Sequence, residues 1–290
     1  MKILLVNKYL YRKGGAETYF IKLGEYLKSL GNEVEYFGMA DERNCVENRV
    51  EAYTENIDFH KKSLKHITYP FKIIYSVNAR KQIRKVLSDF KPDVVHLNNF
   101  NYQLTPSIIY EIKKHNIPIV YTAHDVQLVC PNHKLKNDYT YGLCRKCDGG
   151  KYFECVKNNC VHSSKIRSIL GAVEAWYYKL RHTYKMIDLT VCPSEFMEKE
   201  ISRNDDINGR TVTMYNFIDE IKPLGAECEN YVLYFGRYSE EKGILNLVKA
   251  AKKLSNIPFV FAGKGELENE VNSADNIKNV GFKTGDELRN

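Results

Sequence analysis

Short aliphatic runs that alternate with helical patterns constrain the fold of this chain more than any other feature. The first run, residues 2–7, is followed by a loop with Gly14 and Gly15, and a helical pattern then continues to Gly31. A second run at 34–39 completes a βαβ unit, which favours a parallel sheet. We expect further strands at 94–97, 117–122 and 189–192, and helices at about 77–90, 107–115 and 166–187. The alternation predicts an α/β, Rossmann-like fold.

A second series of the same kind begins after residue 230. It consists of a strand at 231–235, a helix from about 243 to 254 and a strand at 259–262. Between the two series, Pro223, Gly225 and acidic side chains interrupt the apolar periodicity. We therefore expect two domains, 1–219 and 220–290. The charge divides in the same way, with 33 basic and 25 acidic side chains (+8) in the first and 10 and 11 (−1) in the second.

Length and composition narrow the class of protein. The 290 residues are 43% apolar, which is enough to bury real cores. No apolar run approaches the roughly 18 residues of a membrane span, and residues 1–7 are too short and too quickly polar for a signal peptide. We expect a cytoplasmic chain. Its net charge of +7 is modest and no nucleic-acid recognition motif accompanies it, so a nucleic-acid partner is not expected.

Gly14 and Gly15 precede a helix at the end of a predicted strand. In parallel sheets, ligands bind beyond the carboxyl ends of the strands, where free N–H groups at helix N-termini attract anions. The pattern is neither G-x-G-x-x-G nor Gly-Lys-Ser/Thr, which disfavours dinucleotide dehydrogenases and P-loop enzymes. Two interpretations stay open: a plain tight turn, or a backbone that a phosphate or sugar approaches closely.

A second glycine turn carries cations. Gly236 and Arg237 follow a predicted strand, and Glu241, Lys242 and Gly243 stand at the start of a helix. Arg237 and Lys242 are placed to bind one diphosphate together. Taken alone, the same residues are also consistent with a solvated charged turn.

These motifs occur in a recognisable order along the chain: Gly14-Gly15-Ala16-Glu17, His124-Asp125, Pro193-Ser194, Gly236-Arg237 with Glu241-Lys242-Gly243, and Ala262-Gly263-Lys264-Gly265. The series resembles the retaining, nucleotide-sugar-dependent glycosyltransferases of the GT-B fold, the large "group 1" family. The resemblance covers nearly the whole chain, and its most specific parts are GRYSEEKG and FVFAGKGE. It implies two Rossmann-like domains, an acceptor domain first and a donor domain second.

The resemblance also implies roles for individual residues. Arg237 and Lys242 match the basic pair that holds the donor diphosphate and assists its departure, with Gly236 in the same turn. His124 matches the histidine near the donor sugar, although a histidine and aspartate side by side also suit a purely structural role. The remaining glycines match the loops that line the sugar and phosphate cleft and the nucleotide: Gly14, Gly15, Gly263 and Gly265. Fixed cations can stabilise a departing diphosphate without a metal, so no catalytic cofactor is expected.

The chain departs from the family pattern near its end. After Val280, Gly281 and Phe282 these enzymes continue with a helix, a strand and two glutamates eight positions apart that contact the donor, whereas this sequence ends at Asn290. The resemblance therefore implies a C-terminally truncated chain with an incomplete donor domain and uncertain activity. An incomplete sheet would expose an edge and apolar surface.

Five cysteines fall within residues 130–162, which form an insert after His124: Cys130, Cys144, Cys147, Cys155 and Cys160. Reduced cysteines in a cytoplasmic chain indicate metal binding or reactivity before disulfides. Cys144, Cys147, Cys155 and Cys160 suit a tetrahedral structural zinc site, with Cys130 or His162 as an alternative ligand. An iron–sulfur cluster, unligated thiols and disulfides remain open alternatives.

Residues 60–75 mix lysines with aromatic and aliphatic side chains, which suits an anionic membrane surface. The apolar stripe of the predicted helix at 166–187 is interpreted as a core face, with a membrane face as the alternative. The sequence thus predicts a glycosyltransferase that uses a nucleotide-sugar donor and a cell-surface glycan or lipid-linked acceptor, in peripheral contact with a membrane. Two rivals are an inactive remnant and a zinc-stabilised interaction module on a Rossmann-like scaffold.

Overall fold

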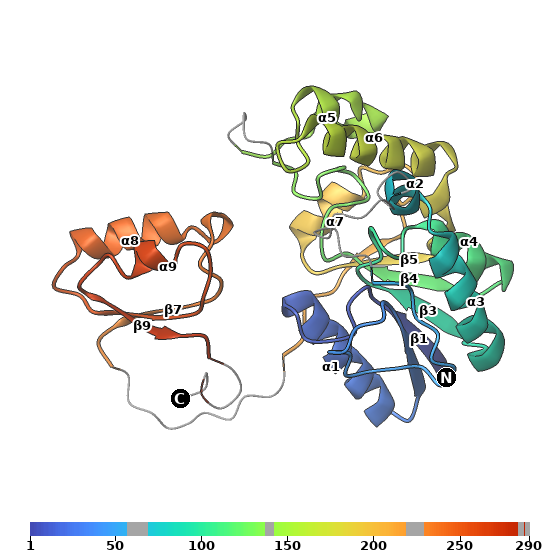
Figure 1. The fold of residues 1–290 in the computed structure, drawn as a ribbon, viewed down its shortest axis with the longest axis horizontal. Coiled ribbons are helices and arrows are strands. Elements are labelled where there is room, and N and C mark those ends of the chain that lie inside the picture. Colours follow the sequence, from blue (N-terminus) through green and yellow to red (C-terminus); the bar gives the residue numbers. More distant parts are fainter. Residues whose placement is uncertain (57–68, 137–141, 219–228, 284–286, 288–290) are drawn as a thin grey trace. The chain divides into compact units, whose positions relative to one another are not determined.

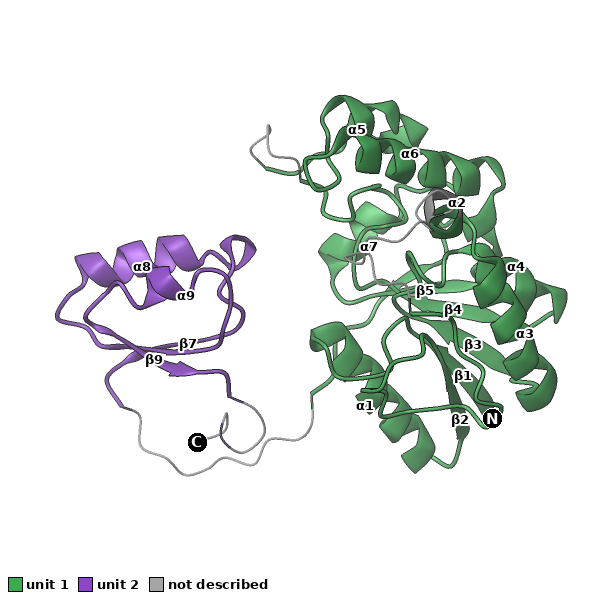
Figure 2. Cartoon of the chain, in the orientation of Figure 1, with its two compact units in different colours: residues 1–218 green, residues 219–290 purple. Residues whose placement is uncertain are grey.

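The fold was analysed in a computed structural model of the chain. The structure describes residues 1–56, 69–136, 142–218, 229–283 and 287. The chain forms two compact units, 1–218 and 219–290 (Figure 2).

A six-stranded parallel sheet forms the centre of the first unit (Figure 1). Its strand order is β2-β1-β3-β4-β5-β6. The strands are β1 (Lys2–Val6), β2 (Glu33–Phe37), β3 (Val94–Leu97), β4 (Ile119–Thr122), β5 (Leu189–Cys192) and β6 (Thr211–Thr213). The first five lie where the sequence predicts them, because strands buried on both faces read as continuous aliphatic runs.

Helices cover both faces of this sheet, as they do in doubly wound folds. They are α1 (Gly15–Ser29), α2 (Tyr69–Ile74), α3 (Val77–Phe90), α4 (Ser107–Lys114), α5 (Phe153–Lys157), α6 (Lys165–Leu180) and α7 (Glu195–Ile201), with 3₁₀ turns η2 (Asp148–Gly150) and η3 (Thr183–Met186). Two separate cores result. Leu4 and Val6 face a core shared with α3 and α4, whereas Ile3 and Leu5 face a core with Phe20 of α1.

The second unit contains the three-stranded parallel sheet β7-β8-β9. Its elements are β7 (Val232–Phe235), η4 (Glu240–Lys242), α8 (Ile244–Lys253), β8 (Phe259–Ala262), α9 (Glu268–Val271) and β9 (Ile277–Gly281). A core of its own packs α8 and α9 against the sheet. The edge strand β7 leaves Leu233 55% and Phe235 64% exposed, which agrees with the apolar surface expected here.

The structure corrects the interpretation of the 166–187 stripe. Most of this segment is α6, which ends at Leu180, and η3 follows it. Ile166 is 73% exposed, Leu180 is 79% exposed, and Ile169 and Val173 are also exposed. The helix instead buries Ser168, Ala172 and Tyr178. The prediction of a core face was wrong for these four residues, whereas Tyr184 and Ile187 of the same stripe are buried in the core. Apolar periodicity identifies an amphipathic helix but does not say which part of its apolar face meets the core.

Candidate functional site

The strand order of the first unit reverses direction at the boundary between β1 and β3. The helix after β1 and the helices after β2 lie on opposite faces of the sheet. In open α/β sheets, ligands bind beyond the carboxyl ends of the strands at such a switch point. The loops that follow β1, β3 and β4 meet there. They carry Gly14 and Gly15, Asn98 and His124, and the rest of the site is built around them.

The glycine loop leads directly into α1. Gly14 is the N-cap residue with φ −163°, an extended conformation open to any residue, so its backbone angle does not require glycine. A Cβ at Gly15 would meet nothing within 4 Å. Neither conformation nor protein packing therefore explains Gly15, and the free N–H groups of the first turn of α1 lie beside this open space. The interpretation of Gly14 and Gly15 as a loop that a phosphate or sugar approaches stays a prediction.

His124 follows β4 and turns towards the loop after β3. Its Nε2 lies 2.9 Å from Oδ1 of Asn98, and its ring packs edge-on against Tyr19 of α1 at 5.3 Å between centroids. Burial lowers the pKa of His124 to about 4, so the ring is neutral at pH 7. Because Oδ1 accepts from Nε2, Nδ1 is left as an acceptor. Within the described residues, Nδ2 of the buried Asn98 has no hydrogen-bond partner.

A charged cluster lies beside His124. Asp125 Oδ2 is 3.3 Å from Nδ1 of His133, and the His133 ring stacks on Tyr102. Lys8 Nζ donates to Asn101 at 2.6 Å, and burial lowers the pKa of this lysine. Burial alone would raise the pKa of Asp125, but the hydrogen bond and charge of His133 outweigh it, so the pKa is lowered. The cluster therefore keeps one carboxylate ionised beside His124.

The sequence prediction assigned no role to Lys8, Asn98 or His133. Asn98 was detectable, because it follows a predicted strand just as His124 does. The positions of Lys8 and His133 depend on which strands are neighbours and on how the insert folds back. No local motif marks them.

The predicted donor residues all lie in the second unit. Arg237 and Lys242 are exposed, the first in the loop after β7 and the second in η4, just before α8. Arg237 Nη1 lies 3.7 Å from Oε1 of Glu241. Gly236 has φ +149°, a conformation that side chains rarely adopt. The turn thus presents two solvated cations at the carboxyl end of a parallel strand.

Packing within the second unit explains why residues 263 and 265, Gly263 and Gly265, are glycines. A Cβ at Gly263 would lie 1.9 Å from the carbonyl oxygen of Gly236, and one at Gly265 would lie 2.2 Å from that of Tyr238. The loops after β7 and β8 are hydrogen-bonded through Tyr238 N to Lys264 O at 3.0 Å. Their predicted place beside a nucleotide stays a prediction.

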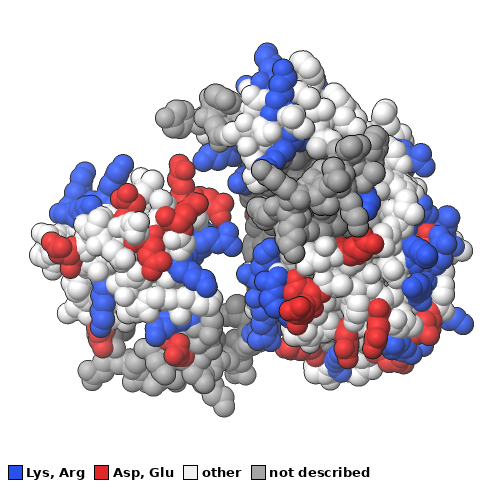
Figure 3. All heavy atoms as spheres, in the orientation of Figure 1, with Lys and Arg blue, Asp and Glu red and all other residues white. Residues whose placement is uncertain are grey.

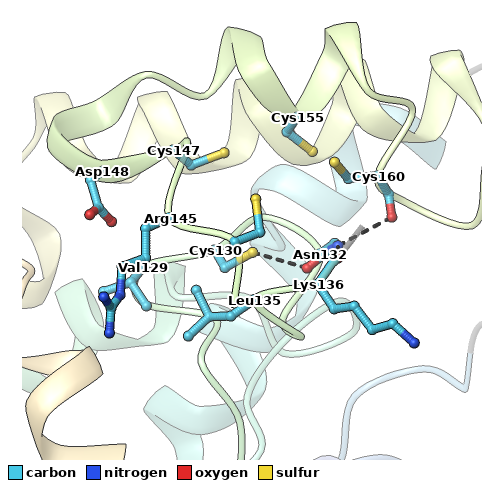
Figure 4. A pocket seen from close by; sticks show the side chains of 11 residues that line it. Val129, Cys130, Asn132, Leu135, Lys136, Arg145, Cys147, Asp148, Cys155 and Cys160 are labelled. Carbon is cyan, nitrogen blue, oxygen red and sulfur yellow. Dashed lines mark hydrogen bonds between the residues drawn. The ribbon is translucent and has the colours of Figure 1, made fainter. Parts of the chain in front are cut away.

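The five cysteines of the insert line one small cavity of about 10 Å³, the cysteine pocket (Figure 4). Cys130 comes from the loop after β4, Cys155 from α5 and Cys160 from the turn after it, while Cys144 and Cys147 flank Arg145. None of the described cysteines is in a disulfide. His162 is exposed and does not line the pocket. As placed, no three His, Cys, Asp or Glu side chains of the described chain are arranged to hold a metal ion.

The structure describes only part of the basic aromatic stretch, residues 60–75. Residues 60–68 of it, with Lys61, Lys62 and Lys65, lie outside the described residues. Residues 69–74 form α2, which ends beside α6: the Tyr178 hydroxyl donates to the carbonyl oxygen of Ile74. None of the helices in the described ranges has the length and apolar character needed to cross a bilayer.

Solved structures share this fold at low sequence identity. The chain superposes on HepE from Anabaena, solved in complex with UDP and glucose, with a TM-score of 0.56 and 16% identity, covering 98% of this chain and 70% of that one. For sucrose-phosphate synthase from Thermosynechococcus elongatus the TM-score is 0.61 at 14% identity, covering 97% and 70%. The apo form of WaaB, a lipopolysaccharide outer core galactosyltransferase, gives 0.54 at 12%, covering 98% and 69%. The predicted α/β fold of the GT-B type is confirmed.

Sequence comparisons agree with the fold. An uncharacterised 42.6 kDa protein in the cps region of Klebsiella pneumoniae is 26% identical, over 91% of this chain and 68% of its own length. The model of Glycosyltransferase Family 4 matches residues 13–221, from the glycine loop through the histidine, the insert and β6. The match covers well over half of the chain, which belongs to Glycosyltransferase Family 4.

Proposed function

We propose that this protein transfers a sugar from a nucleotide-sugar donor to a glycan or lipid-linked acceptor, with retention of anomeric configuration. The observation that carries the proposal is the meeting of the Gly14–Gly15 loop, Asn98 and His124 at the carboxyl edge of the first sheet in a chain of this family. The complexes of HepE with UDP and with UDP-glucose support a uridine nucleotide as the first donor to test. The name of WaaB supports a glycan acceptor.

The transfer needs a stabilised leaving group. The bond between the anomeric carbon and the diphosphate oxygen breaks, and the electron pair leaves with the nucleoside diphosphate. The acceptor hydroxyl oxygen forms its bond to the same face of that carbon and gives its proton to the departing phosphate oxygen. Arg237 and Lys242 neutralise the charge that develops on the diphosphate, so the step needs no metal.

In the first unit, neutral His124 acts as a hydrogen-bonding group. Its pKa of about 4 keeps Nδ1 available to accept from a sugar hydroxyl throughout the neutral range. The open backbone at Gly15 admits the sugar or its phosphate. Both groups thus bind and orient the substrate, and neither has to carry a covalent intermediate.

A panel of nucleotide sugars tests the proposal by product formation and by donor hydrolysis. We expect turnover with one donor, and a fall of about 100-fold or more in kcat for Arg237→Ala with Lys242→Ala. Lys249→Ala, also in the second unit, is the matched control and should keep full activity. Full turnover in the double variant would show that the leaving-group assignment is wrong. A folded chain that binds UDP but turns over no donor would instead be the inactive binding module.

We further propose that α6 contacts an anionic membrane at the cytoplasmic face, where a lipid-linked acceptor would be presented. Its exposed side chains Ile166, Ile169 and Val173 lie beside exposed Lys165 and Arg167. Figure 3 shows Lys and Arg side chains at the end of the unit where Figure 1 places α5 and α6. Apolar groups flanked by cations match an anionic bilayer surface, at about 1 kcal/mol for each near-surface cation.

Vesicle co-sedimentation tests this contact. Phosphatidylserine-containing vesicles should retain the chain, and binding should fall at least about fivefold in Ile169→Ser with Val173→Ser. Tyr26→Ser with Leu30→Ser, which removes exposed apolar groups from α1 and its C-cap, is the control and should bind normally. Equal retention on purely zwitterionic vesicles, or none on either, contradicts the proposal.

A further inference from the structure

The cysteine pocket plays no part in the proposed transfer, and its chemistry points to a separate role. We propose that Cys144, Cys147, Cys155 and Cys160 bind one Zn²⁺ ion, which holds the insert at residues 130–162 in its fold. The inference does not rest on the proposed glycosyl transfer.

Convergence of thiols from separate segments is the first argument. Cys144 and Cys147 form a C-x₂-C pair before η2, whereas Cys155 and Cys160 stand on α5 and in the turn after it. All four line the same cavity, and Figure 4 shows Cys147, Cys155 and Cys160 directed into it. Four cysteines in two pairs, with two to four residues between the members of each pair, are a typical tetrahedral zinc ligand set.

The volume of the cavity distinguishes between a single metal ion and an iron–sulfur cluster, both of which cysteines can bind. About 10 Å³ is the space of one water-sized particle, so a single ion fits. An iron–sulfur cluster, with several iron and bridging sulfide atoms, needs a larger space. Because no three potential ligands among the described residues are in metal-binding geometry as placed, binding draws the four sulfur atoms inwards. The motion required is local, since the thiols already surround one cavity.

Cys130 is assigned outside the ligand set. Its thiol donates to Oδ1 of Asn132 at 2.9 Å, and Nδ2 of Asn132 donates to the carbonyl oxygens of Lys136, at 2.6 Å, and Cys160, at 3.4 Å. Cys130 and Asn132 therefore tie the loop after β4 to the turn that carries Cys160. Such hydrogen bonds around a metal site orient the segments that bear the ligands.

Besides the ion pair between Arg145 and Glu200, a small apolar cluster holds the insert. The buried members of this cluster are Val126, Val129, Cys130 and Leu135, and the last two belong to the insert. Small segments of this kind need a metal or a cross-link to remain folded. The same segment carries His133, which pairs with Asp125 beside His124. A zinc ion would thus also hold His133 in place beside Asp125.

Metal analysis of the whole chain, purified under reducing conditions, is the first test. We expect about one zinc per chain and no iron, with Cys147→Ser and Cys155→Ser each falling below roughly one-tenth of an equivalent. Cys130→Ser keeps a hydroxyl donor for Asn132 and should retain the zinc, as should Cys45→Ser at an exposed thiol outside the pocket.

A second measurement covers the case in which the serine variants fail to fold. Adding Co²⁺ to the chelator-stripped wild-type chain should produce thiolate-to-cobalt charge-transfer absorption, which Zn²⁺ then abolishes. Three results overturn the inference: less than roughly one-tenth of an equivalent of zinc in the folded, reduced chain, sulfide-containing iron in its place, or disulfides among these cysteines. Loss of zinc in Cys130→Ser would overturn the ligand assignment. Zinc content is independent of transfer, so an inactive chain with one zinc leaves the inference standing.

Discussion

At Gly263 a Cβ would lie 1.9 Å from the carbonyl oxygen of Gly236, whereas at Gly15 it would meet nothing within 4 Å. Both glycines were predicted from the same resemblance, yet the fold explains only the first. Packing therefore accounts for the glycine at 263 and not for the one at 15. The proposed approach of a ligand to the backbone at Gly15 gives the two glycines different expected effects on substitution.

A pair of variants tests this difference. Gly15→Ala should raise the stability of the first unit by up to about 1 kcal/mol, because alanine is favoured in a helix, while transfer activity falls about tenfold or more. Gly263→Ala should destabilise the second unit by about 3 kcal/mol or more, since backbone must move. Chemical denaturation and activity assays measure both. Unchanged transfer in Gly15→Ala would remove the ligand-based explanation of this glycine.

Two buried histidines predict a loss of stability in mild acid. Burial lowers the pKa of His96 and of His124 to about 4, below the unfolded value of 6.5. The unfolded chain therefore binds more protons between these values, so stability is fully present above about pH 6.5 and falls as the pH drops towards 4. Each histidine contributes on the order of 3 kcal/mol to this fall.

Urea denaturation at pH 7.0, 5.5 and 4.5 measures the slope. The His96→Gln variant keeps a donor and acceptor near Thr122, whose Oγ1 lies 2.8 Å from His96 Nε2, but removes one titrating group. Between pH 7.0 and 4.5, the free energy of unfolding of this variant should fall by up to about 2 kcal/mol less than that of the wild type. His115→Gln, on an exposed turn, should reproduce the wild-type slope. Parallel slopes for wild type and His96→Gln would argue against a buried neutral ring.

At the scale of elements, the sequence correctly predicts those strands whose two faces are both buried. Strands β1 to β5 were predicted because both of their faces are buried, whereas β6 is a three-residue strand of Thr211, Val212 and Thr213 with no apolar run to detect. The helix α7 was not predicted because its seven residues are too few to show a helical period. For α6 the helix was predicted but its exposed face was not, because sequence periodicity carries no information about what covers a face.

The candidate site was predictable to a lesser degree. Gly14, Gly15 and His124 were identified through the resemblance, and each does follow a strand at the carboxyl edge. Lys8 and His133 were not, because the contact between His133 and Asp125 depends on how the insert folds back. The common cavity of the cysteines was expected from their spacing, but their exact partners, such as Asn132, depend on the loop conformation.

An ion pair between Arg145 and Glu200 attaches the insert to α7. The Glu200 side chain is fully buried and receives the Arg145 guanidinium through two hydrogen bonds, while Arg203 lies 3.9 Å away. Arg145→Ala should destabilise the first unit by about 3 kcal/mol, because a buried carboxylate loses its main partner. Arg12→Ala removes an exposed pair with Glu25 and should cost less than about 1 kcal/mol. Thermal melts compare the two, and equal effects would show that the Glu200 pair is no anchor.

At the scale of the whole molecule, each unit has its own hydrophobic core. The cores of the first unit are built from residues up to Ile207, and that of the second from Tyr238 onwards. The net charge also differs between the two parts of the chain, at +8 for residues 1–219 and −1 for residues 220–290. Figure 3 shows that Lys, Arg, Asp and Glu are interspersed over the visible face of each unit. Domains with separate cores generally unfold as separate cooperative units.

Calorimetry should therefore resolve two unfolding transitions. Because the second unit is small and leaves Leu233 and Phe235 exposed on β7, its transition should come at the lower temperature. Gly263→Ala should shift or abolish this transition only, and Arg145→Ala should shift the other only. A single transition displaced by both variants would mean that the two units unfold together.

The strand order described for the first sheet has a consequence for biosynthesis. After β1 pairs with β2, the strands β3, β4, β5 and β6 join in the order in which they occur along the chain, each at the same growing edge. A nascent chain leaving the ribosome can thus extend the sheet one strand at a time without inserting a late strand between two early ones. Each unfinished sheet exposes its last strand until the next strand pairs with it, and an exposed edge can pair with another chain. Pauses in translation within residues 123–188, between β4 and β5, would therefore carry the greatest risk of aggregation.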